Sequence, residues 1–446
     1  MAQDRKQSDC VATNARPPRG VTRIFIAQHG GVDGTLDGSI AERFDRILRC
    51  YSEGCHVPGG KPVKATENLI VCLGPGTFFT KGTYDFVIDV PHKTSEGFTI
   101  GKGWHIHGAG VDQTTVKLAA YLPFHAHQSP ANMPEDSGAG VVFSTNSDQA
   151  SGVEISDLTI DANYPELKKQ ATAAGIKALN LEAIHLRSDQ GGHWIYEVRI
   201  INAAGEIGAI DIHWETFPVW IVSMKNGSVP QQDNENVIER VSMSNYGGGA
   251  CTAIAVANAV AEVRNNRVEG YGIAFGGWTM GPVWFHDNTA VGTDYGFNID
   301  SLTNQGVRIE HNQIVHPRNY GIVIGGDGTY SNFKIVNNSI EIDKPGVVGL
   351  IFRGNVTGAE VVGNSILAPL GVEASAISNY ATSLLAKPNV NNVYQSNRIS
   401  SQLQVSFRGL SWKSRSCIAG NQDENGKPSR SLPDNHAGAC LTSHLD

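Results

Sequence analysis

One repeated asparagine constrains the fold of this chain more than any other feature. Between residues 263 and 399, six short apolar segments carry an Asn at the same place, at intervals of 22 to 33 residues: Asn266, Asn288, Asn312, Asn338, Asn364 and Asn397. Such intervals are typical of one solenoid coil. Because coils stack at about 4.8 Å, equivalent Asn side chains would exchange hydrogen bonds. We predict a parallel β-helix with an asparagine ladder, each Asn taking the left-handed backbone of a tight turn.

A second short strand follows each Asn segment. These strands keep a common phase with apolar segments earlier in the chain, and together they cover residues 183–186, 209–212, 253–256, 272–275, 296–299, 321–324 and 349–352. Their alternation directs one set of side chains into a dry core and the other outward. The outward face would form a long flat sheet, which suits an extended ligand.

Composition agrees with short strands joined by tight turns. The 446 residues include 50 Gly, and only 17% are charged. Such values fit a β-rich chain better than a helical one. The repeat overrides the multi-domain expectation set by length. We expect an extended or disordered N-terminus over 1–20, one β-helix over 21–410, and a tail packed on the last coils over 411–446.

A capping helix is expected at about residues 39–50. Ser39 is a suitable N-cap, and Glu42 three residues later would complete a capping box. One face of this helix is apolar, and it is formed by Ile40, Phe44, Ile47 and Leu48. The helix would cover the open end of the β-helix, whose unpaired strand would otherwise invite aggregation.

Charge and hydropathy exclude two classes of partner. The formal net charge is −8, without the basic clusters that nucleic-acid binding needs. No apolar run approaches the roughly 20 residues that span a bilayer. An anionic sugar stays open, because a few local basic residues can outweigh the global sign. The first ten residues lack the regions of a signal peptide. We expect a secreted or periplasmic protein whose leader is absent from this sequence.

Seven cysteines leave the redox state open. Cys50 with Cys55 would close a small loop, and Cys417 with Cys440 would staple the tail. Buried free thiols are the alternative, and the spacing matches no zinc pattern. An oxidising compartment is favoured by the first interpretation.

Three segments resemble the pectate-lyase-like superfamily. They are 29–50, a Gly-Asp-Gly entry plus capping helix; 69–79, a first strand with Gly74 where Pro is usual; and 104–118, a Gly-rich coil. With the Asn repeat, the resemblance covers roughly residues 21–410. It implies an all-β fold, a single-stranded right-handed parallel β-helix with an N-terminal capping helix. The superfamily includes polysaccharide hydrolases, uronate lyases, epimerases, transferases and phage tailspikes, so the fold does not give the activity.

In that superfamily, the strand after the Asn turn presents the catalytic face. Two outward columns follow from aligning these strands here: His185, Asp211, Ala255, Ala274, Asn298, Val323 and Ile351; and Arg187, His213, Ala257, Gly276, Asp300, Gly325 and Arg353. Neighbouring coils would place His185 over Asp211 and Arg187 over His213. A His beside a carboxylate is a workable acid–base pair near neutral pH.

The predicted site has two parts. The catalytic residues are expected to be Asp211, His213, His185 and Glu215. The substrate-binding residues are expected to be Arg187, Asp189, Trp214, Trp278, Asn298, Asp300 and Arg353. Arg187 would hold a carboxylate or developing negative charge, and Trp278 would offer an apolar platform for a sugar. Solvation of an exposed strand is the simpler explanation of the same polar residues.

The first functional hypothesis is an enzyme that cleaves glycosidic bonds. A hydrolase or intramolecular glycosyl transferase would use Asp211 with Glu215 or Asp189. The first alternative is a uronate lyase or C5-epimerase, because residues 211–213 resemble the Asp-Pro-His of mannuronan epimerases, although Gly208 stands where those have Tyr. The second is a non-catalytic, tailspike-like glycan-binding protein. The expected partner is a carbohydrate, with a monomer or homo-oligomer, including a trimer, as the assembly.

Neither a metal ion nor a cofactor is expected. No outward column gathers the carboxylates that a calcium site needs. Two His-x-His pairs, His105/His107 and His125/His127, place imidazoles on one strand face. No third ligand is evident beside either pair, so ordinary polar surface is the preferred interpretation.

Overall fold

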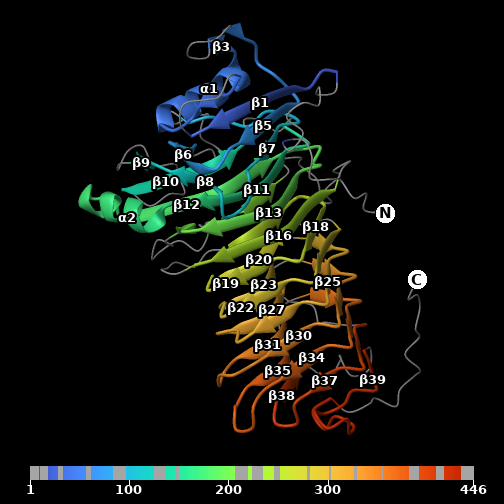
Figure 1. Cartoon of the computed structure of the whole chain (residues 1–446). Helices are drawn as coiled ribbons and strands as arrows, with labels where there is room; N and C mark the ends of the chain where they lie inside the picture. The colour runs from blue at the N-terminus through green and yellow to red at the C-terminus, as the bar shows by residue number, and fades with distance from the viewer. Residues whose placement is uncertain are drawn as a thin grey trace. The chain divides into compact units, whose positions relative to one another are not determined.

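The computed structural model shows a parallel β-helix built from short strands. The structure describes residues 10, 19–28, 34–56, 62–83, 97–124, 136–145, 150–205, 219–222, 235–245, 252–278, 282–300, 303–325, 329–353, 355–380, 391–407 and 416–432. The chain divides into two compact units, unit 1 (1–219) and unit 2 (220–446). Figure 1 shows short strands following one another in chain order within each unit.

Unit 1 contains fourteen strands and two helices among its described residues. The strands are β1 (Thr22–Ala27), β2 (Leu36–Asp37), β3 (Cys55–His56), β4 (Pro62–Val63), β5 (Leu69–Leu73), β6 (Gly76–Thr80), β7 (His105–His107), β8 (Thr114–Leu118), β9 (Leu122–Phe124), β10 (Ser137–Ser144), β11 (Glu154–Asp161), β12 (Ala178–Arg187), β13 (Trp194–Ile201) and β14 (Ala204–Gly205). The helices are α1 (Ala41–Glu53) and α2 (Tyr164–Ala173). β15 (Val219–Val222) spans the boundary between the units.

Parallel pairing aligns the coils of unit 1 residue by residue. β7 pairs with β11, and β11 pairs with β13, so that His105, Glu154 and Trp194 occupy one rung position. Two residues further along, His107, Ser156 and Tyr196 occupy the next position on the same face. Ile106 and Ile155 between them are fully buried. The alternation therefore brings polar residues from three distant segments into two adjacent columns.

Helix α1 caps unit 1, but it starts differently from the prediction. Figure 1 shows it beside β1 and β6. Its N-cap is Ile40, which is 52% exposed and therefore outside the buried stripe. The Ser39 backbone N–H instead donates to Asp37 Oδ1 at 3.0 Å, because Asp37 competes locally for the turn. The predicted stripe is otherwise correct, since Phe44, Ile47 and Leu48 are buried.

A buried carboxyl ties α1 to the first coils. Asp45 lies on the covered face of the helix and is fully buried. It accepts hydrogen bonds from the Thr80 hydroxyl at 2.6 Å and the Lys81 backbone N–H at 2.8 Å. Burial raises the pKa of Asp45 to about 6. Removal from water penalises the ionised form more than these two bonds favour it.

Helix α2 has no counterpart in the predictions. It follows β11, with a Pro in its first turn, where a missing N–H costs nothing. Tyr164, Leu167 and Ala171 are buried at a spacing that gives one face. This short apolar face packs the helix against β12.

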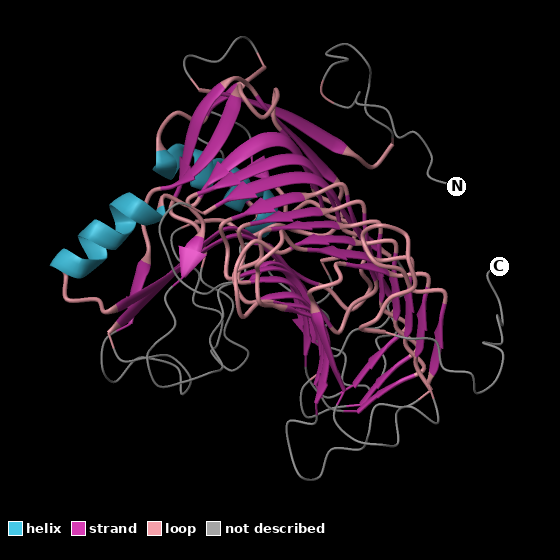
Figure 2. Ribbon diagram, turned by 90° about the horizontal axis from the view of Figure 1, so that it is seen from below, coloured by secondary structure: helices cyan, strands magenta, loops and turns pink. Residues whose placement is uncertain are grey.

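Unit 2 repeats one pattern along its described length. Its strands are β16 (Asn236–Ser244), β17 (Thr252–Ala257), β18 (Ala261–Arg264), β19 (Arg267–Glu269), β20 (Ile273–Trp278), β21 (Val283–His286), β22 (Thr289–Val291), β23 (Tyr295–Asp300), β24 (Thr303–Gln305), β25 (Arg308–Glu310), β26 (Gln313–Val315), β27 (Tyr320–Ile324), β28 (Thr329–Ser331), β29 (Lys334–Val336), β30 (Ser339–Glu341), β31 (Val348–Arg353), β32 (Asn355–Thr357), β33 (Glu360–Val362), β34 (Ser365–Leu367), β35 (Ser375–Tyr380), β36 (Val393–Gln395), β37 (Arg398–Ile399), β38 (Gln404–Phe407) and β39 (Cys417–Ala419). Figure 2 draws the strands of the protein in magenta, in stacked rows.

The asparagine ladder is confirmed, and it has a seventh rung. Asn338 illustrates the unit: its amide donates to Asn364 Oδ1 at 2.9 Å and to the Ile309 carbonyl at 2.7 Å. Asn421 continues the ladder by accepting from the Asn397 backbone N–H at 2.9 Å. All six predicted Asn side chains are buried.

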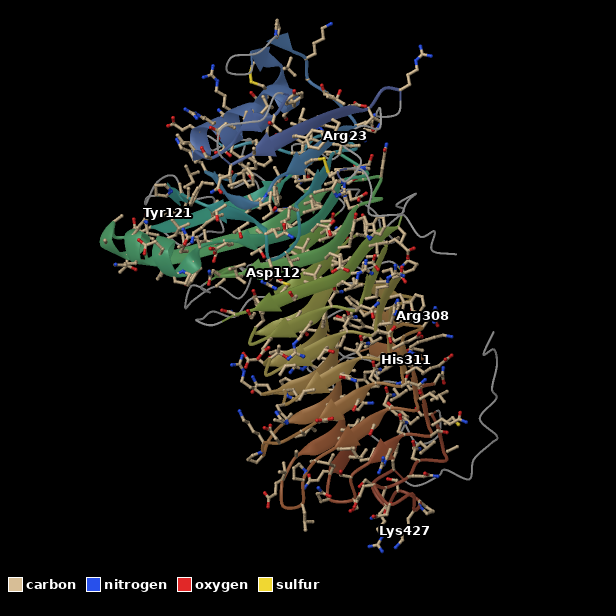
Figure 3. The ribbon with its side chains drawn as sticks, viewed as in Figure 1. Arg23, Asp112, Tyr121, Arg308, His311 and Lys427 are labelled. Carbon is tan, nitrogen blue, oxygen red and sulfur yellow. A yellow bond between two sulfur atoms is a disulfide. The ribbon has the colours of Figure 1, made fainter. Side chains whose placement is uncertain are left out.

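The left-handed residue is the one before each ladder Asn, which corrects the prediction. Positive φ occurs at Asn265, Asp287, His311, Asn337, Gly363, Ser396 and Gly420. His311 is labelled in Figure 3. The two demands of the turn therefore fall on neighbouring residues: one supplies backbone curvature, and the next supplies buried hydrogen bonds. Five residue types fit the first place, because it faces solvent and needs only tolerance of the left-handed region.

The second-strand alignment of the prediction is wrong at β20. Phe275 pairs with Phe297, so Gly276 rather than Ala274 is level with Asn298. Trp278, not Gly276, is level with Asp300. The segments 272–275 and 296–299 look alike in sequence, but Phe275 and Phe297 stack in the core with ring centroids 5.0 Å apart, and this contact sets the register.

Two disulfides are described. Cys50–Cys55 agrees with the prediction, whereas Cys10–Cys72 was not foreseen. Cys417 is also disulfide-bonded, and Cys440, its predicted partner, lies outside the described residues. Helices capable of crossing a membrane are not found in the described part of the chain.

Candidate active site

The predicted residues of unit 1 lie at the end of β12. His185 is buried, and its Nδ1 lies 3.5 Å from Glu182 Oε2. The Arg187 backbone N–H donates to Thr145 Oγ1 at 2.8 Å. Asp189 is half-buried. His185 thus has a carboxylate neighbour, Glu182, from its own strand, a contact that the sequence columns did not indicate.

The other predicted catalytic residues fall outside the described part of the chain. Asp211, His213 and Glu215, together with Trp214, belong to the segment 206–218. Their roles, and the role of His185 as their partner, stay predictions.

The predicted residues of unit 2 lie on β20, β23 and β31. Trp278 and Asp300 share a rung; Asn298 is half-buried and Asp300 is exposed. The guanidinium of Arg353 lies 4.7 Å from the ring centroid of Tyr320, which stacks on Tyr295 at 5.1 Å. The apolar members of the same outward column, Val323 and Ile351, are buried, so this part of the column is closed to solvent.

A polar pocket in unit 1 gathers a different set of reactive side chains. Its volume is about 300 Å³, and its lining includes Asn68, Lys102, His105, Ser151, Glu154 and Trp194. These residues come from β7, β11 and β13 and from the turns that precede β5, β7 and β11. The residue between His105 and His107 points into the core, so both imidazoles face the pocket side of the sheet.

Glu154 is the centre of this cluster. Its Oε1 accepts a hydrogen bond from the Tyr196 hydroxyl at 2.8 Å. Its Oε2 lies 3.6 Å from His105 Nδ1, and its Oε1 lies 3.7 Å from His107 Nε2. Both separations exceed hydrogen-bond length. Burial is the main reason that the pKa of Tyr196 is raised, with the Glu154 carboxylate adding to it. Tyr196 therefore stays a proton donor to Glu154 at neutral pH.

A chain of hydrogen bonds fixes the second imidazole. His107 Nδ1 lies 2.7 Å from Ser156 Oγ, and the Ser156 hydroxyl donates to Asp157 Oδ2 at 2.7 Å. Because Ser156 has one proton and gives it to Asp157, its oxygen accepts from His107 Nδ1–H. Because Nδ1 carries the proton, the other ring nitrogen, Nε2, carries the lone pair, and Nε2 is the nitrogen that faces Glu154.

An aromatic pair borders the carboxylate. Trp194 and Tyr196 have ring centroids 4.4 Å apart, and Trp194 is half-buried at the pocket wall. Lys102, which is exposed, contributes the cation of the pocket lining. The arrangement combines an apolar surface, a positive charge and acid–base groups within one hollow.

Sequence reasoning identified His105 and His107 but not Glu154. The third group is 49 positions beyond His105 in the sequence, and only the pairing of β7 with β11 brings it level. His125 and His127, the other pair, lie outside the described residues.

Comparisons by sequence identify no relative. No protein-family model matches the chain, and no curated protein matches it.

Comparison of structures identifies proteins of the same fold. A mutant tailspike protein of E. coli bacteriophage HK620 in complex with a pentasaccharide gives a TM-score of 0.53 at 11% identity, covering 91% of this chain and 67% of that one. DFA-IIIase from Arthrobacter chlorophenolicus A6, without its lid and in complex with GF2, gives 0.46 at 10% identity, covering 86% and 97%. The A-module of the Azotobacter vinelandii mannuronan C-5 epimerase AlgE6 gives 0.39 at 13% identity, covering 79% and 90%.

The tailspike likeness confirms the predicted fold, a right-handed parallel β-helix. At this identity it speaks for the fold alone. The fold is thereby established, and the activity has to be argued from the site.

Proposed function

We propose that this protein is a glycan-active enzyme that cleaves glycosidic bonds at the unit 1 pocket. One observation carries the proposal: the pocket places the Glu154 carboxylate and the His105 imidazole beside Trp194 and Lys102. Indole faces are common platforms for the apolar faces of sugars. A carboxylate with an adjacent imidazole is suited to proton transfer during bond cleavage.

The pocket supplies separate groups for binding and for chemistry. Trp194 and Asn68 would contact sugar faces and hydroxyls, and Lys102 would hold an anionic substituent. His105, His107 and Glu154 form the reactive centre, with Tyr196 orienting the carboxylate. A sugar ligand is compatible with this fold, since the tailspike protein was solved with a pentasaccharide.

The assay is the release of new reducing ends from a panel of neutral and acidic polysaccharides. Glu154→Gln should reduce the rate at least about 100-fold, the usual size of one acid–base contribution. Trp194→Ala should raise KM more than it lowers kcat. The matched control is Trp284→Ala in unit 2, which should leave both constants unchanged.

The same assay tests the sequence-based site. If Asp211→Asn abolishes cleavage while Glu154→Gln retains it, the reaction occurs at the residues predicted from sequence and the pocket proposal fails. If the protein binds a polysaccharide and releases no product, it is a glycan-binding protein of the tailspike-like kind. Sizing would support that outcome by showing a trimer.

A uronate lyase or epimerase is the second candidate. Lys102 favours it, because a cation beside the reactive centre can neutralise a uronate carboxylate during proton abstraction. Ultraviolet absorbance of an unsaturated product identifies a lyase, and a change in uronate configuration without new ends identifies an epimerase.

We also propose that the protein works in an oxidising compartment. Two described disulfides support this location, because such bonds persist outside the reducing cytosol. Purification from separated cell fractions and medium would test it, and a wholly cytosolic, reduced protein would contradict it.

A further inference from the structure

We propose that His105, His107 and Glu154 bind one divalent transition-metal ion of the zinc type. One atom from each residue lies within 4.8 Å of the other two. The ion would occupy the same three side chains that form the proposed reactive centre, and in the metal-bound protein its open coordination position would take over from direct proton transfer by Glu154 and His105. Metal binding itself does not depend on glycan cleavage, because it is a property of these three side chains alone.

The spacing of the three ligands fits an ion. Zinc binds imidazole nitrogen and carboxylate oxygen at about 2.0–2.2 Å, which in tetrahedral geometry separates two ligand atoms by about 3.4 Å. The two observed imidazole–carboxylate separations are 3.6 and 3.7 Å. They run to different oxygens of the carboxylate, Oε2 and Oε1. Both are too long for hydrogen bonds and close to the spacing of ligands on one metal that the two imidazoles and the carboxylate would share.

The neighbouring residues orient both kinds of ligand. Ser156 accepts the Nδ1 proton of His107, so that Nε2 presents its lone pair toward the carboxylate. Tyr196 holds Glu154 through a hydrogen bond of 2.8 Å. Metal-binding histidines usually have their second nitrogen fixed in this way, and ligating carboxylates are themselves hydrogen-bonded. His105 Nδ1, which is buried and has no hydrogen bond to any residue that the structure describes, supplies the third ligand atom.

The ligand set selects the class of ion. Two imidazoles and one carboxylate suit Zn²⁺, Co²⁺ and related ions, whereas Ca²⁺ and Mg²⁺ prefer oxygen alone. Three protein ligands leave a coordination position free, as in catalytic rather than structural zinc sites. His105 and Glu154 line the pocket, so this position would open onto it.

The test is a titration of the full chain, freed of metal by a chelator, with Co²⁺ and then with Zn²⁺ in competition. We expect one equivalent of Co²⁺ to produce the visible absorption bands of a low-symmetry site, and Zn²⁺ to remove them. Glu154→Gln and His107→Ala should each weaken binding at least about 100-fold, because two ligands hold an ion poorly. Ser156→Ala should weaken it by about 10-fold by releasing the tautomer of His107.

Controls separate metal loss from unfolding. His105→Ala alters a half-exposed side chain and should remove binding while circular dichroism and the melting temperature of the metal-free protein stay unchanged. His286→Ala, which removes a carboxylate-bound imidazole in unit 2, should leave binding intact. Absence of stoichiometric binding in the wild type, or equal affinity in the wild type and in Glu154→Gln, overturns the proposal.

The two proposals fail separately. Metal titration needs no sugar, so it can succeed for a protein that cleaves no glycan. Cleavage that persists in the chelated protein would leave the glycan proposal standing and would show that any bound ion is not needed for the reaction.

Discussion

Unit 1 and unit 2 each place histidine beside carboxylates on the outer face of a parallel sheet, but at different spacing. In unit 2, His286 Nε2 lies 2.9 Å from Glu262 and its Nδ1 lies 2.6 Å from Asp287. In unit 1, His105 and His107 lie 3.6 and 3.7 Å from Glu154. The first cluster is closed by hydrogen bonds, whereas the second is held apart. Equal residue types thus give a stabilising network in one unit and a candidate reactive centre in the other.

The turns next to these two faces also differ between the units. In unit 2 from β18 onward, the turn position holds a buried Asn, and each pair of strands such as β29 and β30 is separated by it; β16, with Val241 after the left-handed Arg240, keeps the form found in unit 1. In unit 1 the equivalent places, after the left-handed residues Asp157 and Glu197, are Leu158 and Val198. There β11 and β13 run through the bend as single strands. The polar groups of the unit 1 turn are consequently on the outside, where Asp157 joins the chain of bonds to His107.

The largest expected effect comes from giving unit 2 the turn of unit 1. In Asn338→Leu, the Ile309 carbonyl loses a donor, and the Asn312 backbone and side-chain amides lose their acceptor. At about 1–3 kcal/mol for each buried group left without a partner, the loss of unfolding free energy should be about 5 kcal/mol. Chemical denaturation measures it, and hydrogen exchange should show the loss concentrated in unit 2.

The neighbouring left-handed position provides the control. Asn337 is exposed and has φ 54°, and Asn337→Gly should be nearly neutral, as Gly363 already occupies the equivalent place. A small effect of Asn338→Leu would mean that the ladder is dispensable, and the contrast between the two turns would lose its energetic meaning.

Acid should destabilise unit 1, because this unit contains a buried imidazole, that of His193. His193 accepts the Val153 backbone N–H at 3.2 Å, and burial lowers its pKa to about 3. Because the unfolded chain binds the proton first, stability is lost as pH falls below the ordinary value of 6.5. The loss should reach roughly 4 kcal/mol between about pH 7 and about pH 3.

Comparison with His193→Asn isolates this contribution, because Asn keeps an acceptor for Val153 and does not titrate. The difference between wild type and variant should grow on acidification and should appear as lost exchange protection in peptides of unit 1. A difference that stays constant with pH would contradict the assignment.

Asp45, which also lies in unit 1, should change the stability of the protein with pH in the opposite direction to His193. Its folded pKa of about 6 lies above the ordinary value of 3.8, so its contribution is fully present below 3.8 and is lost as pH rises through 6. The change should be about 3 kcal/mol. Asp45→Asn should therefore stabilise the protein relative to wild type at neutral pH and lose that advantage in acid. Parallel pH profiles for the two proteins would show that Asp45 does not titrate as proposed.

The periodic part of the fold could be predicted because its signal repeats. Each ladder Asn meets the same neighbours, and the six predicted Asn residues give five intervals in which the same spacing can be recognised. The same interval would have corrected the β20 register: Asn266 to Asn288 spans 22 residues, as does Phe275 to Phe297. The prediction instead aligned residues 272–275 with residues 296–299, because these two Gly-led segments look alike in sequence.

The candidate site could not be predicted in the same way, because the coils of unit 1 have unequal lengths. His105, Glu154 and Trp194 are 49 and 40 residues apart, so no single period aligns them. Burial was equally hidden: a strand pattern gives the direction of His185 or Val323, but not what packs over it. The bond between Cys10 and Cys72 joins positions 62 apart, for which spacing alone offers no guide.

The smallest effect should come from the outer face of unit 2. The Arg308 guanidinium, labelled in Figure 3, lies 4.5 Å from the Trp284 ring centroid and 2.8 Å from Glu310. Arg308 is 45% exposed, so Arg308→Ala should cost only about 0.5–1 kcal/mol, partly screened by salt. Thermal denaturation at low and high salt measures it.

The rate of glycan cleavage by Arg308→Ala tests whether substrate binds to unit 1 or to unit 2. Trp284 stacks on His286 at 3.9 Å and its indole N–H donates to Glu310 at 3.0 Å, so its ring is engaged by protein groups, whereas Trp194 lines a pocket. Cleavage should therefore be unaffected by Arg308→Ala and impaired by Trp194→Ala. A loss of activity in Arg308→Ala without a matching loss of stability would place substrate on unit 2, and the division between a reactive face and a stabilising face would be wrong.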